Sequence, residues 1–388
     1  MKRVIVVGGG FAGAYIARKL EKSFDVTLID TKNYFEFTPS VLRTLVEPEH
    51  IRYIQRDHHR YLQQTRVVQD HVREVREHDL KTSHHTFPFD YLVICSGSRY
   101  NSPIKEEDLV VASRAEELRR FAHKLHKAQN VLIIGGGIVG VELAAEIITT
   151  YPNKKITLVH AHQRVMERMP PAVSSYAENF LTMRGVQIIY NTRVEINKKS
   201  QSEHSSGVFF NLAWDQYRSS QVTSVREFPT ETTAGYDTQA RNQRKTYHLS
   251  RGEKITPDLA FLCTGITPNS EFMEKNFLSL LTEKKYVNVT KTLQVEGKKH
   301  MFAAGDVTSI QEEKTAQNAE KQAQVVVENI LRQERGETAI EYHSRPRVMV
   351  ISLGRWNGIL TYKNVVLTGI LPGIMKTLIE WKTMWRYR

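Results

Sequence analysis

The sequence predicts an α/β fold in which one strand–turn–helix–strand pattern occurs twice. The first copy runs from Val4 to Asp30 and the second from Val131 to His160. In each copy, β-branched residues lead into a glycine-rich turn, and a helical pattern and a second apolar strand follow. Because about 127 residues separate the two copies, they predict two separate domains and exclude a solenoid of short repeats.

Each element of the two copies has its own signal. A short apolar run predicts each strand, and apolar residues at helical spacing follow each turn. The first copy has the strand 4–7, the turn 8–13, the helix 14–22 and the strand 26–29. The second has the strand 131–134, the turn 135–140, the helix 141–150 and the strand 156–159.

Composition agrees with folded domains. The chain has 388 residues, of which 40% are hydrophobic and two are Cys. This apolar fraction is enough for real cores. Two cysteines exclude a disulfide scaffold and a four-thiolate metal site, and we expect no metal. The formal net charge of +12 is compatible with nucleic acid, an anionic membrane or acidic cofactors as partners.

No segment reaches the roughly 20 apolar residues that are needed to span a bilayer. The longest run, from Val365 to Met375, contains Pro372. The chain begins with a strand-like run and shows neither a signal peptide nor a Met-Gly lipidation start. We therefore expect a protein of the cytosol or of a membrane surface that faces it.

Both glycine-rich turns have the spacing of dinucleotide-binding sites. The first glycine of each turn permits a tight turn, the second lets a pyrophosphate approach the backbone, and the third allows close helix–strand packing. The free N–H groups at the start of each helix then favour phosphate. These glycines are Gly8, Gly10 and Gly13 in the first copy and Gly135, Gly137 and Gly140 in the second, and the adjoining Phe11, Ala12, Ile138 and Val139 are expected to contact the same cofactors.

The residue that closes the second strand differs between the copies. Asp30 can bond both ribose hydroxyls, and Thr31 and Lys32 are expected to belong to the same site. The second copy has His160 there, which does not repel a 2′-phosphate as a carboxylate does. We therefore expect the second site to accept NADH and/or NADPH. The alternative is that His160 is a bystander and that Gln163 or Arg164 contacts the adenosine.

Three further apolar strands end in small or acidic residues at turns. Two dinucleotide sites in one chain suggest that one site binds a flavin, as FAD, and that the other binds a nicotinamide. The turns after the three strands would complete both sites. The first two strands stop after Cys95 and Cys263, and the third leads to an Ala-Gly-Asp turn and is expected to be followed by a helix. The turn residues are Ser96, Gly97, Thr264, Gly265, Ile266, Gly305 and Asp306.

This ordered set of motifs resembles the flavoproteins with two dinucleotide-binding domains, the glutathione-reductase-like group. The resemblance implies two Rossmann-like domains, with the NAD(P) domain inserted in the FAD domain and Asp306 on the ribityl chain of the flavin. It implies FAD-binding parts at 1–112 and 269–334, an NAD(P)H-binding domain at 113–268 and a C-terminal membrane-associating region at 335–388. We expect an enlarged β-hairpin or meander at 197–250.

The positions of the cysteines distinguish between branches of this flavoprotein group. Disulfide reductases of this group carry a Cys-x4-Cys pair after the first strand pair, and residues 31–60 contain no Cys. We expect Cys95 and Cys263 to be small buried residues, since free Cys is often buried in that way. Electrons would then leave the flavin directly.

Two segments resemble type II NADH:quinone oxidoreductases. Residues 33–39, which include Phe37, Thr38 and Pro39, resemble a segment beside the flavin of that family. Residues 315–323 resemble the Ala-Gln motif at its quinone pocket. The resemblance implies that Thr315 and Ala316 line that pocket and that Gln317 faces a quinone carbonyl. The alternative is ordinary Ala packing with a solvated Gln.

Three residues are candidates for the reaction itself. The Gly-Val-Glu piece that ends at Glu142 matches the family and would place this carboxylate at the nicotinamide–flavin junction. Its alternative role is a helix-terminal charge that interacts with the dipole. Glu142, Gln317 and Lys314 are the groups that we expect to relay protons to the quinone.

The tail is basic and aromatic. Residues 342–388 contain eight Lys or Arg, one Asp or Glu, and three of the four Trp. An apolar helical face is predicted from residues at three- and four-residue spacing, with cations toward anionic lipid. The apolar residues are Leu371, Ile374, Met375, Leu378, Trp381 and Trp385, and the cations are Lys376, Lys382, Arg386 and Arg388. The alternative is a helix docked on the protein's own core or in a dimer interface.

Residues 352–355 and 381–384 resemble apoptosis-inducing-factor-like (ferroptosis-suppressor-like) flavoproteins. We therefore expect an FAD-dependent NAD(P)H:quinone oxidoreductase that passes hydride to the flavin and then reduces a ubiquinone-like membrane quinone without pumping protons. It would be a peripheral membrane protein on a cytoplasmic face, could form a homodimer and would bind no specific nucleic acid. The alternative is an apoptosis-inducing-factor-like oxidoreductase with a soluble protein acceptor or a nucleic-acid-binding role.

Overall fold

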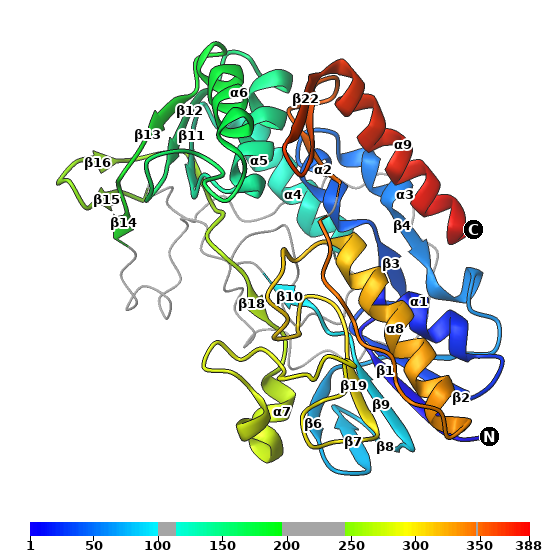
Figure 1. The fold of residues 1–388 in the computed structure, drawn as a ribbon. Coiled ribbons are helices and arrows are strands. Elements are labelled where there is room, and N and C mark those ends of the chain that lie inside the picture. Colours follow the sequence, from blue (N-terminus) through cyan, green and yellow to red (C-terminus); the bar gives the residue numbers. More distant parts are fainter. Residues whose placement is uncertain (100–113, 196–244, 347) are drawn as a thin grey trace, which may run out of the picture.

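The computed structural model describes residues 1–99, 114–195, 245–346 and 348–388. Figure 1 shows two α/β parts with a helix along the outside that ends at the C-terminus. Most of the meander that was predicted at 197–250 lies outside the described residues, as does the predicted domain boundary at 112.

The first sheet has five parallel strands in the order β19-β9-β1-β2-β5. Its central strand β1 lies between β9 and β2, and its last four residues are buried. The unbroken apolar sequence of β1 suits this position, because both faces of a central parallel strand are covered. Helices α1 and α8 pack side by side over this sheet (Figure 1). The bounds are β1 (Arg3–Val7), β2 (Asp25–Asp30), β5 (Arg66–Gln69), β9 (Tyr91–Ile94), β19 (Met301–Ala303), α1 (Phe11–Leu20) and α8 (Ala316–Glu334).

The second sheet is parallel as well, in the order β13-β12-β11-β17. The chain leaves the first sheet after β9 and returns to it at β19, so that the second α/β part is inserted in the first. The bounds are β11 (Asn130–Ile134), β12 (Lys155–Val159), β13 (Gln187–Ile189), β17 (Leu259–Leu262), α4 (Arg114–Lys127), α5 (Ile138–Thr150) and α6 (Pro171–Thr182). The Rossmann-like sheets that the sequence predicted are confirmed.

Smaller elements surround the two sheets. The strands β6 (Val72–Val75), β7 (Asp79–Thr82) and β8 (Thr86–Pro88) form an antiparallel meander, and β14 (Val194–Glu195), β15 (Tyr247–Leu249) and β16 (Lys254–Ile255) form another. Two antiparallel pairs join β3 (Tyr34–Glu36) to β4 (Gln55–Asp57) and β10 (Ser98–Arg99) to β18 (Thr267–Pro268). The short helices are α2 (Val41–Thr44), α3 (Ile51–Ile54) and α7 (Glu271–Phe277).

The helix that the sequence predicted after the Ala-Gly-Asp turn is α8. It begins at Ala316, where the Thr315 hydroxyl accepts a hydrogen bond from the Asn318 N–H at 3.3 Å. A side chain of α8 also contacts this turn, because the Gly305 N–H donates to Gln322 Oε1 at 2.7 Å. This bond connects α8 to the Ala-Gly-Asp turn.

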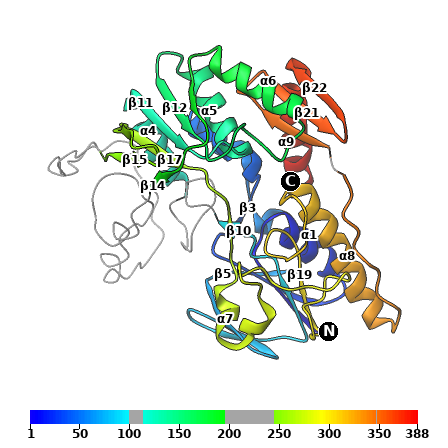
Figure 2. The same cartoon turned by 60° about the vertical axis from the view of Figure 1, so that its left-hand side comes forward.

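The C-terminal part consists of a three-stranded antiparallel sheet and a long helix. These elements are β20 (Met349–Ser352), β21 (Gly358–Tyr362), β22 (Val365–Gly369) and α9 (Ile370–Arg386). Figure 2 shows this sheet beside α6, and α9 packs on its strands and on α3. The C-terminal part therefore touches both α/β parts.

Candidate functional site

One cavity of about 1680 Å³ lies between the two α/β parts. Both glycine turns line it, and so do residues of α8, β20 and α9. All the residues that the sequence predicted for cofactor binding or for the reaction are on its wall except Gly13 and Gly140. Those two sit where a Cβ would collide with the carbonyl oxygens of Gly8 and Gly135, so they serve helix–strand packing.

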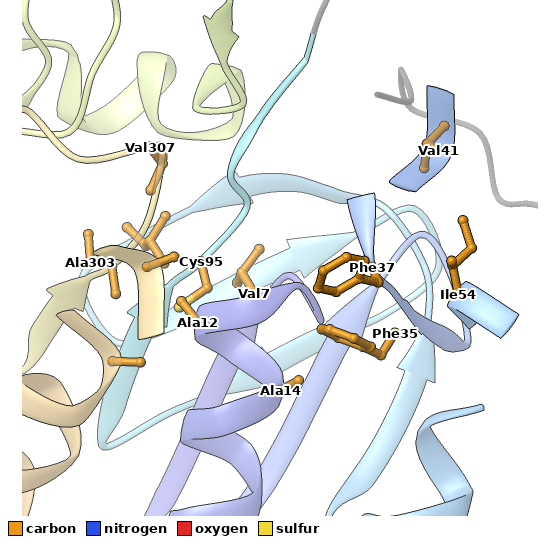
Figure 3. Packing of buried hydrophobic residues seen from close by; sticks show 14 of the residues in the cluster. Val7, Ala12, Ala14, Phe35, Phe37, Val41, Ile54, Cys95, Ala303 and Val307 are labelled. Atoms are coloured by element: carbon orange, nitrogen blue, oxygen red, sulfur yellow. The ribbon is translucent and has the colours of Figure 1, made fainter. Parts of the chain in front are cut away.

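The first turn is shaped for a close backbone approach. Gly8 has φ of +98°, and a Cβ there would collide with the Cys95 carbonyl. Gly10 faces open space in which a Cβ would meet no atom within 4 Å. Figure 3 shows Val7, Ala12 and Cys95 packed close together at this turn. The close approach of Gly8 to the Cys95 carbonyl and the open space at Gly10 fit a pyrophosphate at the start of α1.

Asp30 stands at the edge of this turn and is buried. Its carboxylate accepts the N–H of Gly9 and, at 3.0 Å, the N–H of Lys32. Burial raises the pKa of Asp30, but Lys32, His58 and the backbone donors outweigh burial and leave this pKa below its ordinary value. The ionised carboxylate suits ribose hydroxyls, which are hydrogen-bond donors, and the first site therefore fits FAD.

The second turn repeats the geometry with a different side chain at the strand end. Gly135 has φ of +110° and approaches the Cys263 carbonyl. The Gly136 N–H donates to His160 Nδ1 at 3.0 Å. Arg164, the alternative adenosine contact, instead donates to the carbonyls of Met169 and Glu167. The open glycine and the start of α5 fit the phosphates of a nicotinamide dinucleotide.

Both cysteines are free and buried, at the ends of β9 and β17. Burial raises the pKa of the Cys263 thiol to about 12 and raises the pKa of Cys95 as well. Neither group is a thiolate at neutral pH, so neither is suited to thiol exchange. The prediction of two small buried residues is confirmed.

Glu142 lies at the junction of the two α/β parts, and its partner was missed by sequence reasoning. Lys376 of α9 places its Nζ 2.6 Å from Glu142 Oε1 and 2.8 Å from the Ser352 hydroxyl. The Ser352 N–H also donates to Glu142 Oε1, at 2.8 Å. The side chains of Lys376 and Glu142 are only 13% and 9% exposed.

The prediction that Lys376 faces lipid is therefore wrong, because the buried carboxylate of Glu142 requires a charged partner. Arg386, another predicted lipid-facing cation, forms an ion pair with Glu320 at 3.1 Å. The residue spacing along α9 carried no signal for the contact of Arg386. For Lys376, a signal would have been the single cation within an otherwise apolar stretch.

The other two reaction candidates are on the cavity wall but already have partners. Gln317 Nε2 donates to the Val348 carbonyl at 2.9 Å. Lys314 Nζ donates to the carbonyls of Thr308 and Ile310 at 2.7 and 3.0 Å. Burial lowers the pKa of Lys314, although the nearby carboxylate of Asp306 opposes the shift. The role predicted for each of them in proton transfer remains a prediction.

Helix α9 is oriented with its polar face inward. Glu380 and Thr383 are buried, whereas Leu378, Trp381 and Trp385 are 57–61% exposed. The apolar face that the sequence predicted is thus open to solvent. Among the described residues, no helix is long and apolar enough to cross a membrane.

Comparison with known proteins agrees with the fold and the paired turns. The sequence profile of the pyridine nucleotide-disulphide oxidoreductase family matches residues 2–213 and 224–323. Apoptosis-inducing factor homolog B of Dictyostelium discoideum is 28% identical over 372 residues, which cover 92% of this chain and 89% of that protein. Ferroptosis suppressor protein 1 of Homo sapiens is 25% identical over 402 residues, which cover 98% and 95%.

Among solved structures, NDH2 from Plasmodium falciparum in complex with NADH is similar in fold. The TM-score is 0.76 at 13% identity, and the match covers 100% of this chain and 96% of that one. The resemblance to apoptosis-inducing-factor-like and type II NADH dehydrogenase-like flavoproteins is confirmed. The chain belongs to the pyridine nucleotide-disulphide oxidoreductase family, as a flavoprotein oxidoreductase whose cofactors are FAD and NAD(P)H.

Proposed function

We propose that the protein is an NAD(P)H:quinone oxidoreductase that acts at a membrane surface and does not pump protons. The observation that carries the proposal is the continuity of one cavity from both nucleotide turns to helix α9. When bound, FAD supplies the two-electron chemistry between NAD(P)H and the quinone. The remaining tasks belong to this chain's own residues.

The acceptor end of the cavity combines apolar walls with one buried ion pair. Val350 and Ile379 supply apolar surface for a flat ring. Reduction of a quinone to a quinol takes two protons as well as two electrons. Lys376 holds a proton at Nζ, beside the carboxylate of Glu142, so this pair can donate a proton and recover it from solvent.

The exposed face of α9 supports peripheral membrane contact. Leu371, Ile374, Leu378, Trp381 and Trp385 are exposed along it, and β22 adds Val365 and Leu367. Indole rings prefer the headgroup depth of a bilayer, and the exposed Lys382 and Arg388 favour anionic lipid. A lipid-soluble quinone would then reach the cavity without leaving the membrane.

The acceptor assignment is tested with Lys376→Met in anaerobic stopped-flow experiments. We expect NADH to reduce the flavin at nearly the wild-type rate, and the reduced flavin to react with ubiquinone about 100-fold more slowly, because a general acid is lost. Lys382→Met, on the exposed face of the same helix, is the control and should change neither rate.

Loss of Lys376 also leaves Glu142 buried without its cation. The double variant Glu142→Gln/Lys376→Met removes this buried charge, and it should be more stable than Lys376→Met without regaining quinone reduction. Equal loss of both half-reactions in Lys376→Met, or full quinone reduction in the double variant, would show that the pair takes no part in acceptor chemistry.

The membrane assignment is tested by vesicle flotation of Trp381→Glu/Trp385→Glu. We expect at least about tenfold weaker partitioning onto anionic vesicles, because the buried apolar area and the aromatic anchors are lost. Turnover with a short, water-soluble quinone should be unchanged. Met183→Glu, at an apolar residue that is 84% exposed on the inserted domain, is the matched control. Wild-type partitioning of the double variant would contradict membrane contact through α9.

A further inference from the structure

The two nucleotide turns differ in one position that decides which coenzyme fits. In the first turn the Gly9 N–H donates to the carboxylate of Asp30. In the second, the Gly136 N–H donates to His160 Nδ1 at 3.0 Å. Asp30 is the last residue of β2, and His160 directly follows β12, the corresponding parallel strand of the second sheet. In the second domain, His160 therefore accepts the backbone N–H bond of the turn, which the Asp30 carboxylate accepts in the first domain.

This contact fixes the protonation of the ring. A nitrogen that accepts an N–H carries no proton, so the neutral ring of His160 carries its proton on Nε2. That atom lies 2.8 Å from Glu167 Oε2, to which it donates. A carboxylate is thus present at the second site, one imidazole ring farther from the loop than Asp30 is at the first.

The segment that carries Glu167 is held in place by its neighbour. The Arg164 guanidinium donates to the Glu167 carbonyl at 2.5 Å, to the Met169 carbonyl at 3.0 Å and to the Ser174 hydroxyl at 2.9 Å. These three bonds hold the Arg164 guanidinium within the loop. Of the two side chains that meet here, His160 is buried, whereas the Glu167 side chain is 36% exposed and lines the cavity.

Glu167 still has acceptor capacity for a ligand. His160 engages Oε2, and His162 Nε2 lies 3.3 Å from Oε1. A carboxylate has about four lone-pair sites, so these two contacts leave room for hydroxyl donors. Ribose hydroxyls are such donors, whereas a 2′-phosphate brings negative charge against a carboxylate.

We infer that Glu167, presented by His160, is the specificity residue of the second site and makes the protein prefer NADH to NADPH. The preference arises from repulsion of the 2′-phosphate and from hydrogen bonds to the ribose hydroxyls. Arg168 and Arg193 also line the cavity, and they are the cations that could offset this repulsion. Both are exposed, so that solvent screens their charge. The inference rests only on the NAD(P)H step of the proposed function.

The test measures kcat/KM for anaerobic flavin reduction by NADH and by NADPH, which needs no quinone. We expect the wild type to prefer NADH by at least about tenfold. Glu167→Gln keeps the shape and removes the charge, and it should raise the NADPH-to-NADH ratio at least about tenfold, mainly through a lower KM for NADPH. Glu283→Gln is the matched control, because it removes a carboxylate from the same cavity and should leave the ratio unchanged.

A second variant separates charge from loop structure. His160→Asp/Glu167→Gln returns the carboxylate to the strand end, as in the first domain, and should restore the preference for NADH. Equilibrium binding of NAD⁺ and NADP⁺ gives the same ratio without any reaction. A wild type that favours NADPH, or an unchanged ratio in Glu167→Gln, overturns the inference. Selective NADH oxidation without quinone reduction would instead contradict the proposed acceptor and leave the role of Glu167 intact.

Discussion

His58 lies against the first nucleotide turn, and its side chain is fully buried. Its Nδ1 lies 2.5 Å from the Tyr61 hydroxyl, and a Cβ on Gly9 would collide with its Nε2. Nε2 has no hydrogen-bond partner among the described residues. Burial lowers the pKa of His58 to about 4, although the carboxylate of Asp30 opposes this shift. The ring is therefore neutral in the folded protein at physiological pH.

A buried neutral histidine makes the protein sensitive to acid. The unfolded chain binds this proton near pH 6.5, and the folded chain binds it only near pH 4. Stability is thus unaffected above pH 6.5 and falls as the pH drops toward 4, by about 3 kcal/mol from this group. His58→Phe should remove that part of the decline in urea unfolding at pH 7, 6, 5 and 4.

His59 is exposed and adjacent, so His59→Phe is the control and should keep the wild-type decline. An identical pH slope in His58→Phe and in the wild type would mean that acid destabilisation comes from other groups.

Residue spacing predicted part of the candidate site and missed another part for identifiable reasons. Asp30 could be predicted because the turn, helix and strand of one nucleotide-binding unit fix its distance along the chain from Gly8. Glu167 lies in an irregular loop, where no periodicity reports direction. Lys376 is 234 positions from Glu142, and their pairing depends on which face of α9 points inward.

At the scale of elements, α9 reverses the usual rule that a helix buries its apolar face. Its inward face carries Glu380, which lies 3.1 Å from His50. Burial raises the pKa of Glu380, but hydrogen bonds from His50 and Ser40 outweigh burial and lower it. Just beyond the helix, the ring of Tyr387 stacks on Phe35 with 4.1 Å between centroids. The helix is therefore held by polar contacts along its length, and near its end by the buried Met384 and by the ring of Tyr387, which contacts Phe35 and Tyr61.

Tyr387→Ala tests this anchoring. The ring is buried between Phe35 and Tyr61, and removal of a buried aromatic ring typically costs about 3–5 kcal/mol. We expect a loss of this size in the free energy of unfolding and faster amide exchange over the last turns of α9. Trp385→Ala, at a ring that is 58% exposed, should change stability by less than about 0.5 kcal/mol. Equal effects of the two substitutions would contradict this account of the anchoring.

At the scale of the whole molecule, the topology was predictable from the sequence and the C-terminal packing was not. Each parallel sheet could be predicted from strand–turn–helix units, because their sequence patterns are local. The return of the chain to the first sheet at β19 could be predicted from the resemblance to flavoproteins with two dinucleotide-binding domains. The bond between Gln322 of α8 and the Gly305 N–H is a tertiary contact that no local sequence pattern reports. The orientation of α9 depends on buried partners in both α/β parts.

Helix α9 is bound to both domains at once, and this limits how the enzyme can move. Lys376 is tied to Glu142 of the inserted domain, whereas Glu380 and Tyr387 are tied to His50 and Phe35 of the other. A buried ion pair between Arg43 and Glu146, at 3.3 Å, joins the same two domains. A hinge opening would have to break one of these sets of contacts. With all of these contacts in place, the coenzyme must therefore enter and leave the cavity without a change in the angle between the two domains.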